Sequence, residues 1–382
     1  MKKIAIIVTH PIQYYTPVFK LITERDNGVT LKVFFTWGKK SLEAKFDPGF
    51  KKTVAWDIPL LDGYQYEFLE NTSSKPGSHH YRGINNPDGR RRICEFNPDV
   101  ILIYGWAYQS HFGLLHYFKG RIPIWFRGDS TLLNEKPGWK KKLRTLFLKY
   151  IYKHIDKAFY VGTANKMYFL KHKVAESDLI FAPHAIDNNR FGEDRSVEAQ
   201  NLRKEIGVSN DAILLLYAGK FEPVKNPLLL LQAFKDLNIK NVHLLFVGNG
   251  ELEDSLKRSS CTGATRIHFM DFQNQSYMPV VYQACDLFCL PSKSETWGLA
   301  VNEVMAAGKA IIVSDKVGCA VDLVKDSNGS IFKSEDIEDF KVKLSLLCQS
   351  KEGLKEKGNK SKEIIDEWSF EKQVEAFENM LS

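Results

Sequence analysis

The sequence lacks the features by which several large protein classes are recognised. Its 382 residues contain only six cysteines, with no Cys-x-x-Cys pair and no histidine spaced to complete a zinc site. They are Cys94, Cys261, Cys285, Cys289, Cys319 and Cys348. We therefore expect reduced thiols in a cytosolic protein, and no metal site is predicted. No apolar run reaches membrane-spanning length, and the start MKKIAIIVTH predicts a first β-strand rather than a signal peptide.

Charge is distributed unevenly along the chain. Residues 1–190 contain 30 Lys and Arg against 17 Asp and Glu, whereas the remaining residues contain 23 against 29. This asymmetry indicates two domains, of which only the basic one meets an acidic partner. Nucleic acid, anionic lipid and an acidic substrate would all suit a basic half, but no helix-turn-helix, finger or RNP-like pattern supports the first. No Gly-x-Gly-x-x-Gly follows the first strand, which disfavours a dinucleotide-dependent dehydrogenase.

The stretch from Leu287 to Asp315 predicts a strand, loop, helix and strand, which is one unit of a parallel α/β sheet. Glu295 lies in the loop and Glu303 lies within the helix. Unpaired N–H groups at a helix N-terminus favour phosphates. A carboxylate beside such a site suits the hydroxyl groups of a sugar, which donate hydrogen bonds to it. The alternative is two ordinary polar residues near a helix start, and the glutamates alone do not decide between these interpretations.

The two glutamates resemble the Glu-x7-Glu signature of retaining glycosyltransferase family 4. Members of that family have the GT-B fold, with two Rossmann-like, doubly wound parallel-sheet α/β domains facing across a cleft. The resemblance covers residues 213–332 well and the first half in outline. It implies that Glu295 contacts the donor sugar and Glu303 the nucleotide ribose. The residues implied to line the donor site between them are Thr296, Trp297, Gly298 and Leu299.

A basic pair follows the predicted strand at residues 213–217. After Gly219 come Lys220 and Lys225, and then Asn226 is a suitable N-cap for a second helix. Two cations at a helix N-terminus can neutralise a diphosphate leaving group without metal. Family 4 proteins usually carry Arg and then Lys at this place. Here Lys220 stands where Arg is usual, so the compact charge of an ammonium group replaces a guanidinium group that can donate two parallel hydrogen bonds. Solvated lysines on a turn are the alternative.

The resemblance also implies a nucleoside diphosphate sugar as donor and no cofactor. UDP is slightly favoured over GDP. The loop that begins at Phe272 is where similar proteins hold the nucleotide base.

The first half offers acceptor-side candidates where predicted strands end. They are His10, Gln13, Trp106, His111, Arg127 and Asp129. A turn role for His10 and a satisfied helix position for His111 remain alternatives. Residues 38–52 form a Lys-rich loop that is too long for a mere connection, and long loops in compact domains are often lids or binding loops.

Residues 137–157 interleave lysines with apolar residues at helical spacing. An apolar stripe with basic flanks is typical of a helix on an anionic membrane surface. A core-packed helix with solvated lysines suits the pattern equally well. Family 4 enzymes often act on lipid-linked acceptors, so the resemblance favours peripheral contact with the inner face of the membrane.

We therefore predict a cytoplasmic retaining glycosyltransferase that moves a sugar to a glycan or lipid-linked acceptor in cell-surface polysaccharide synthesis. Residues 1–190 would bind the acceptor, residues 191–364 the nucleotide sugar, and residues 365–382 would form a helix crossing back towards the first domain. Catalysis is assigned to Lys220, Lys225 and Glu295. A GT-B sugar-nucleotide epimerase and a non-catalytic GT-B partner or binding subunit remain as rivals.

Overall fold

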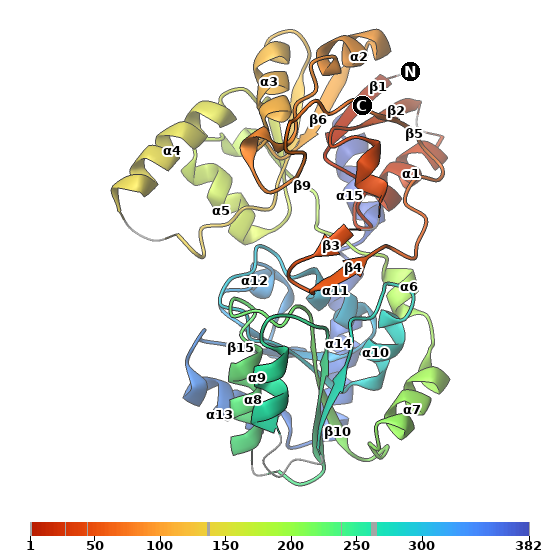
Figure 1. Ribbon diagram of the computed structural model, residues 1–382, viewed down its shortest axis with the longest axis vertical. Coiled ribbons are helices and arrows are strands. Elements are labelled where there is room, and N and C mark those ends of the chain that lie inside the picture. The colour runs from red at the N-terminus through yellow and green to blue at the C-terminus, as the bar shows by residue number, and fades with distance from the viewer. Residues whose placement is uncertain are drawn as a thin grey trace. The chain divides into compact units, whose positions relative to one another are not determined.

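The computed structural model describes residues 2–26, 28–43, 45–135, 138–237, 239–260 and 266–381. Pro137, where the predicted amphipathic helix was expected to begin, and the thiol of Cys261 lie outside these ranges. The chain divides into two compact units, each built on a parallel sheet (Figure 1). The first unit comprises Met1–Glu43, Pro59–His184 and Phe370–Ser382, and the second comprises Ala44–Ile58 and Ala185–Ser369.

The sheet of the first unit is formed by strands β1 (Lys2–Val8), β2 (Val29–Phe35), β5 (Gln65–Phe68), β6 (Val100–Tyr104), β7 (Ile124–Arg127), β8 (Lys157–Tyr160) and β9 (Leu179–Phe181). Their order is β5-β2-β1-β6-β7-β8-β9, and all neighbours are parallel. The central strands are buried apolar runs, as a parallel sheet covered by helices requires. The strand order reverses between β1 and β6, and ligands of open α/β sheets bind at such points, beside the carboxyl ends of the strands.

Helices cover this sheet. They are α1 (Thr16–Glu24), α2 (Gly89–Phe96), α3 (Gln109–Phe118), α4 (Trp139–Tyr152), α5 (Thr163–Lys171) and α15 (Phe370–Glu378), with short 3-10 turns η1 (Lys39–Leu42), η2 (Tyr81–Gly83) and η3 (Glu176–Asp178). The last helix belongs to this unit because Phe377 packs on Phe159, with ring centroids 4.7 Å apart, and Arg25 pairs with Glu378 at 2.8 Å.

The sheet of the second unit is formed by strands β10 (Ile213–Ala218), β11 (Val242–Val247), β12 (Ile267–Met270), β13 (Leu287–Leu290), β14 (Ala310–Ser314) and β15 (Gly329–Phe332). Their parallel order is β12-β11-β10-β13-β14-β15, so the strand order reverses between β10 and β13. Both sheets therefore have doubly wound topology, which is the predicted fold class.

The helices of the second unit are α6 (Asn188–Gly192), α7 (Ser196–Glu205), α8 (Pro227–Asp236), α9 (Glu253–Ser260), α10 (Met278–Ala284), α11 (Leu299–Ala306), α12 (Ala320–Leu323), α13 (Ile337–Leu347) and α14 (Lys351–Ile365). The stretch 188–209 is polar and has no long apolar run, yet it contains two of these helices. Scattered apolar residues suffice to anchor them, because Phe191 and Leu202 are fully buried. Asn226 does precede α8, but its side chain makes no capping hydrogen bond, since its backbone is left-handed with φ 55°.

One part of the first half of the sequence belongs to the second unit. Strands β3 (Lys45–Asp47) and β4 (Lys52–Val54) pair as an antiparallel hairpin, and Ala44–Ile58 as a whole packs with the second sheet's unit. A division by sequence position at residue 190 would assign this hairpin to the other domain. The described cysteines are free thiols, and Cys94 is the exposed one among them. None of the described helices is long and apolar enough to cross a membrane.

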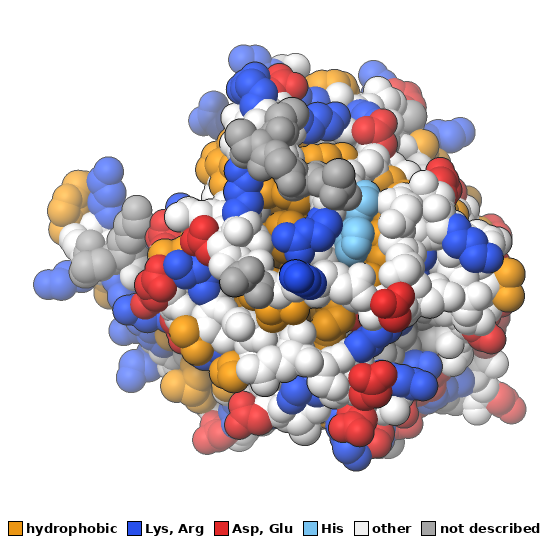
Figure 2. All heavy atoms as spheres, turned by 90° about the horizontal axis from the view of Figure 1, so that it is seen from below, with side chains coloured by type: hydrophobic (Ala, Val, Ile, Leu, Met, Phe, Trp, Pro, Cys, Tyr) orange, Lys and Arg blue, Asp and Glu red, His pale blue; other side chains and the backbone are white. Residues whose placement is uncertain are grey.

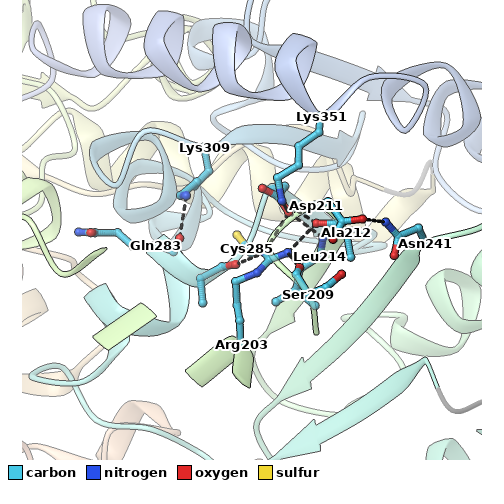
Figure 3. A network of polar contacts seen from close by, with 12 residues as sticks. Arg203, Ser209, Asp211, Ala212, Leu214, Asn241, Gln283, Cys285, Lys309 and Lys351 are labelled. Carbon is cyan, nitrogen blue, oxygen red and sulfur yellow. Dashed lines mark hydrogen bonds and ion pairs between the residues drawn. The ribbon is translucent and has the colours of Figure 1, made fainter. Parts of the chain in front are cut away.

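A buried ionic network fixes the amino-terminal edge of the second sheet (Figure 3). Arg203 of α7 is 6% exposed and donates to the carbonyl oxygens of Ala212, Ser209 and Ala284. It also pairs with Asp286 at 3.1 Å, and Lys351 of α14 reaches the same carboxylate at 3.3 Å. One guanidinium thus ties α7, α10 and the start of β10 together.

Loss of the Arg203 guanidinium should destabilise the second unit strongly. In Arg203→Met, the carboxylate of Asp286 and several carbonyl groups lose a buried partner, which costs about 3–5 kcal/mol. The free energy of unfolding from urea titration followed by circular dichroism measures this. Arg195→Met is the matched control, because Arg195 pairs with Glu193 and Glu198 at the surface and its loss should cost about 0–1 kcal/mol. Equal losses in the two variants would contradict the role given to Arg203.

Candidate functional site

The carboxyl edge of the second sheet brings two predicted site residues together. Lys225 follows β10 and Glu295 follows β13, and these are the two strands between which the strand order reverses. Their side chains form a hydrogen-bonded ion pair, Nζ to Oε2. Both are partly buried, with side-chain exposures of 25% and 18%. The pair is therefore shielded from bulk water more than an ordinary surface ion pair.

Backbone contacts hold the two loops in this arrangement. The amide of Lys293 donates to the carbonyl oxygen of Val224 at 2.8 Å, which joins the loop after β13 to the loop after β10. The Glu295 amide donates to the carbonyl oxygen of Lys316 at 3.1 Å. Helix α11 then begins after Gly298, whose φ of 97° favours glycine and whose added Cβ would lie 2.9 Å from Val317. The position of the Glu295 carboxylate is thus set from both sides.

Glu303 lies one turn inside α11 and is 3% exposed. The Tyr282 hydroxyl of α10 donates to its Oε2 at 2.7 Å. A buried carboxylate is tolerated only when hydrogen-bonded, so Tyr282 is its structural support. No sequence pattern indicated Tyr282, because its contact with Glu303 joins two different helices.

The predicted donor-lining residues divide into two groups. Thr296 is exposed and Leu299 is half-buried. Trp297 is only 2% exposed, its indole N–H donates to Asn302 at 2.9 Å, and its ring packs on Trp368 at 5.2 Å. The Trp297 side chain thus supports the loop from the interior, and only its backbone remains for a ligand.

Lys220 does not join the pair of Lys225 and Glu295. Its Nζ lies 2.9 Å from Asp47 Oδ1 and 5.1 Å from the ring centroid of Phe50, both on the β3–β4 hairpin. The carbonyl oxygen of Lys220 accepts from the buried Tyr217 hydroxyl at 2.7 Å, which fixes the turn after β10. Sequence reasoning missed Asp47 and Phe50, although the length of the loop at 38–52 indicated a binding role.

Phe272 lies on the loop after β12 and packs on Phe50, with ring centroids 4.6 Å apart. Its backbone amide donates to Asn249 Oδ1 at 2.9 Å. Gly219 follows β10 directly, and its amide donates to the carbonyl oxygen of Val247 at 3.0 Å. Both residues therefore lie at the same carboxyl edge as Lys220.

The first unit contains a cavity of about 220 Å³ at the carboxyl edge of its own sheet. Residues at the ends of β1, β6, β7, β8 and β9 contribute to it, so it lies at the point where that strand order reverses. It is lined by Val8, Thr9, Ile12, Tyr15, Tyr104, Gly105, Ala107, Tyr108, Arg127, Gly128, Asp129, Val161 and His184. This volume lies below the range of about 300–1,000 Å³ that is usual for small-molecule pockets, so it suits a single sugar ring rather than an oligosaccharide.

Burial sets the protonation of the groups in this cavity. It raises the pKa of Tyr104 to about 12, against the opposing charge of Arg127, and it also raises that of Tyr15. Burial and the charge of Arg127 lower the pKa of His184 to about 3. The cavity thus presents neutral hydroxyl and imidazole groups near neutral pH, beside the Asp129 side chain. The buried Tyr104 hydroxyl makes no hydrogen bond with any described residue, so it can meet a polar group of a ligand.

Arg127 and Asp129 are the predicted acceptor-side residues that line this cavity. Arg127 is 2% exposed and donates to the carbonyl oxygens of Ala182 and Pro183 at 2.9 and 3.0 Å. The cavity is not lined by the other predicted acceptor-side residues, which are His10, Gln13, Trp106 and His111. Trp106 packs on Phe147 of α4 at 5.5 Å.

His10, Gln13 and His111 lie elsewhere in the first unit. His10 contacts Thr9 at 2.8 Å and stands edge-on to the Trp37 ring, and Gln13 is 5% exposed. His111 is fully buried: its Nδ1 lies 3.0 Å from the Gly105 carbonyl oxygen and its Nε2 2.9 Å from the Thr36 hydroxyl. The His111 ring is therefore held in the interior of the first unit by two hydrogen-bonding partners.

No sequence motif indicated the tyrosines or His184 that line the cavity. The available signal was position, because Tyr104 ends β6 and His184 follows β9, as Arg127 ends β7.

Comparisons with known proteins find glycosyltransferases among the similar sequences. Residues 198–364 match the family model for group 1 glycosyl transferases. The lipopolysaccharide 1,2-N-acetylglucosaminetransferase of Salmonella typhimurium is 36% identical over 130 residues, which are 31% of this chain and 34% of that enzyme. The alignments span about a third of the length of such curated relatives.

Solved structures match over the whole chain. Sucrose-phosphate synthase from Thermosynechococcus elongatus has a TM-score of 0.74 at 16% identity, covering 100% of this chain and 98% of that one. HepE of Anabaena in complex with UDP and glucose has a TM-score of 0.70 at 16% identity, covering 100% and 99%. At such identities the likeness shows the fold alone. Together with the two doubly wound units it confirms the predicted GT-B fold.

The buried His111 predicts a pH dependence of stability. Burial lowers its pKa in the folded chain to about 4, below the ordinary value of about 6.5. Between these values the unfolded chain binds a proton that the folded chain does not, so stability falls as the pH falls through this window. His184, whose folded pKa is about 3, acts in the same direction.

We expect thermal unfolding to shift to lower temperature from pH 7.5 to pH 5.0. His111→Gln should reduce the slope by about 1.4 kcal/mol per pH unit within the window. His79→Gln, at an exposed position, is the control and should keep the parent slope. An unchanged slope in His111→Gln would show that this histidine does not titrate differently in the two states.

Proposed function

We propose that this chain is a retaining, metal-independent glycosyltransferase of family 4 that acts on a nucleoside diphosphate sugar. The observation that carries the proposal is the ion pair of Lys225 and Glu295, at the carboxyl edge where strand order reverses. It lies within residues 198–364, which match the glycosyltransferase model. A UDP-sugar is the favoured donor, and a GT-B neighbour solved with UDP supports this choice.

The donor would bind on the second unit. The N-terminus of α11 and the ammonium groups of Lys220 and Lys225 supply the positive charge that a diphosphate needs. Glu295 would orient the sugar through its hydroxyl groups. It is a poor nucleophile, because Lys225 already neutralises its carboxylate. Glu303, supported by Tyr282, would accept hydrogen bonds from the ribose.

The transfer step needs no side-chain base. The bond between the anomeric carbon and the diphosphate oxygen breaks, and the acceptor oxygen bonds to that carbon on the same face. The acceptor's proton passes to the departing phosphate oxygen, so atoms and charge balance. Preorganised cations stabilise the charge that develops on the leaving group, which is the largest contribution such a site makes.

The acceptor would bind on the first unit. Its cavity offers neutral tyrosine hydroxyls, a neutral imidazole at His184 and the carboxylate side chain of Asp129. These groups suit the hydroxyls of a glycan or a lipid-linked sugar, as expected in cell-surface polysaccharide synthesis. The 36% identical relative is named for a transfer to lipopolysaccharide, which supports this acceptor class.

Helix α4 supports contact with an anionic membrane surface from the cytoplasmic side. It buries Leu148 and Ile151, yet it leaves a second apolar face in solvent. Exposed fractions on that face are 69% for Trp139, 57% for Leu143 and 62% for Leu146. Figure 2 shows apolar and basic side chains side by side at the left of the molecule, where α4 lies in Figure 1. A double-faced helix with flanking lysines fits a lipid surface better than a core-packed helix.

Removing the Lys225 ammonium should slow the reaction. Lys225→Ala loses a charge-assisted contact worth about 1.5–3 kcal/mol, so kcat/KM with a UDP-sugar should fall about ten- to a hundredfold. Lys293→Ala is the control on the neighbouring loop, because Lys293 pairs with the exposed Glu335 and should change the rate less than about threefold. Equal rates in Lys225→Ala and the parent chain would remove this residue from the mechanism.

Polar substitutions on the exposed face of α4 should weaken binding to vesicles. Leu143→Gln combined with Leu146→Gln should lower partitioning onto phosphatidylglycerol vesicles about tenfold or more in a sedimentation assay, because two apolar side chains no longer enter the interface. Val342→Gln with Leu346→Gln is the control, since these side chains of α13 are 59% and 60% exposed. Parent-like partitioning of the α4 variant, or no preference over phosphatidylcholine vesicles, would contradict membrane contact.

A further inference from the structure

The segment that contains the β3–β4 hairpin is fastened to the loops at the carboxyl edge of the second sheet. Lys52 pairs with Asp271 at 2.6 Å, just after β12. The Asn274 side chain donates to the carbonyl oxygen of Ala55 at 2.6 Å. Further along, the amide and hydroxyl of Ser276 donate to the Asp57 carboxylate. These contacts lie on the loop after β12, at the carboxyl edge of the second sheet, so the segment lies beside the proposed donor site.

The tip of the hairpin places a carboxylate on Lys220. Asp47 Oδ1 lies 2.9 Å from Lys220 Nζ and accepts from the amides of Gly49 and Phe50 at 2.8 and 3.2 Å. Burial alone would raise the pKa of Asp47, but these hydrogen bonds and the Lys220 charge hold it below its usual value. The ionised Asp47 carboxylate offers negatively charged oxygen atoms to the Lys220 ammonium group, as a phosphate would.

The tip fits closely against the loops beneath it. A Cβ added at Gly49 would lie 2.3 Å from Glu222 Oε1 and 2.6 Å from Lys220 Cδ. A Cβ added at Gly250 would lie 2.9 Å from the Gly49 carbonyl oxygen. Phe50 continues this contact by packing on Phe272. The hairpin tip therefore occupies the space directly beside the Lys220 side chain.

We propose that Asp47 is an internal competitor of the donor diphosphate for Lys220, so that the β3–β4 hairpin is a working part of the donor site. The inference rests on the proposed function and adds a residue that determines donor affinity. A diphosphate that binds Lys220 displaces the Asp47 carboxylate, while the anchors at Ala55 and Asp57 keep the hairpin attached. The position of the hairpin then differs between the donor-bound and the donor-free chain.

A double-mutant cycle with UDP as the probe tests the competition. Asp47→Asn removes the charge but keeps an oxygen for the amides of Gly49 and Phe50, so the turn is preserved. Both partners of the pair are 31% exposed, and a pair of this kind shifts an equilibrium by about two- to fivefold. Calorimetry should show UDP binding about two- to fivefold tighter in Asp47→Asn than in the parent chain. In a Lys220→Met background, Asp47→Asn should leave the UDP affinity unchanged.

Asp57→Asn is the matched control for loosening of the segment. It removes a carboxylate anchor on Ser276 but frees no cation, so the UDP affinity should stay within about twofold of the parent. If Asp57→Asn tightened UDP binding as much as Asp47→Asn, hairpin mobility rather than charge would be responsible, and the competition would be refuted. Unchanged or weaker binding in Asp47→Asn would refute it as well.

The proposed function can fail separately from the hairpin inference. Glu303→Gln should weaken UDP binding if the nucleotide lies where we propose, irrespective of Asp47. An effect of Glu303→Gln with none of Asp47→Asn overturns only the competition. If the parent chain binds neither UDP nor GDP, the donor site is wrong, and the role of Asp47 is wrong with it.

Discussion

The ion pair between Lys225 and Glu295 is the contact on which the site of the second unit depends. It joins the two loops that leave the sheet on either side of the strand-order reversal, so it exists only because β10 and β13 are neighbours with parallel carboxyl ends. In this partly buried position, the ammonium group of Lys225 and the carboxylate of Glu295 neutralise each other's charge. The pair thereby holds a carboxylate and an ammonium group side by side in one small region, where either charge buried alone would be costly.

The same topology explains why polar chemistry gathers in the first unit. There, too, the strand order reverses beside β1, and the ends of five strands supply the lining of one cavity. Burial keeps its tyrosines protonated and His184 neutral, which suits hydrogen bonding to hydroxyl groups rather than proton abstraction. The second unit thus gathers charged groups at the carboxyl edge of its sheet, and the first unit gathers neutral hydrogen-bonding groups at its own. This division is the one that the proposed transfer needs.

The sequence predicted the fold and assigned Lys225 and Glu295 to one site because both follow from local patterns: apolar runs, turns and the rule that parallel strands end together. The sequence did not indicate which residues, distant along the chain, a given side chain contacts in the folded protein. Trp297 stands within the motif, yet its ring packs on Trp368 in the interior. His111 follows a strand end but is satisfied by Thr36. Asp47 reaches Lys220 from the other half of the sequence, and no periodicity could indicate that contact.

A crystal structure of the chain with bound UDP would show where the nucleotide lies. We expect the diphosphate within hydrogen-bonding distance of Lys225 Nζ and of the first amides of α11, with the ribose hydroxyls on the Glu303 carboxylate. A nucleotide bound anywhere else, with Lys225 and Glu295 remote from its phosphates, would contradict the account.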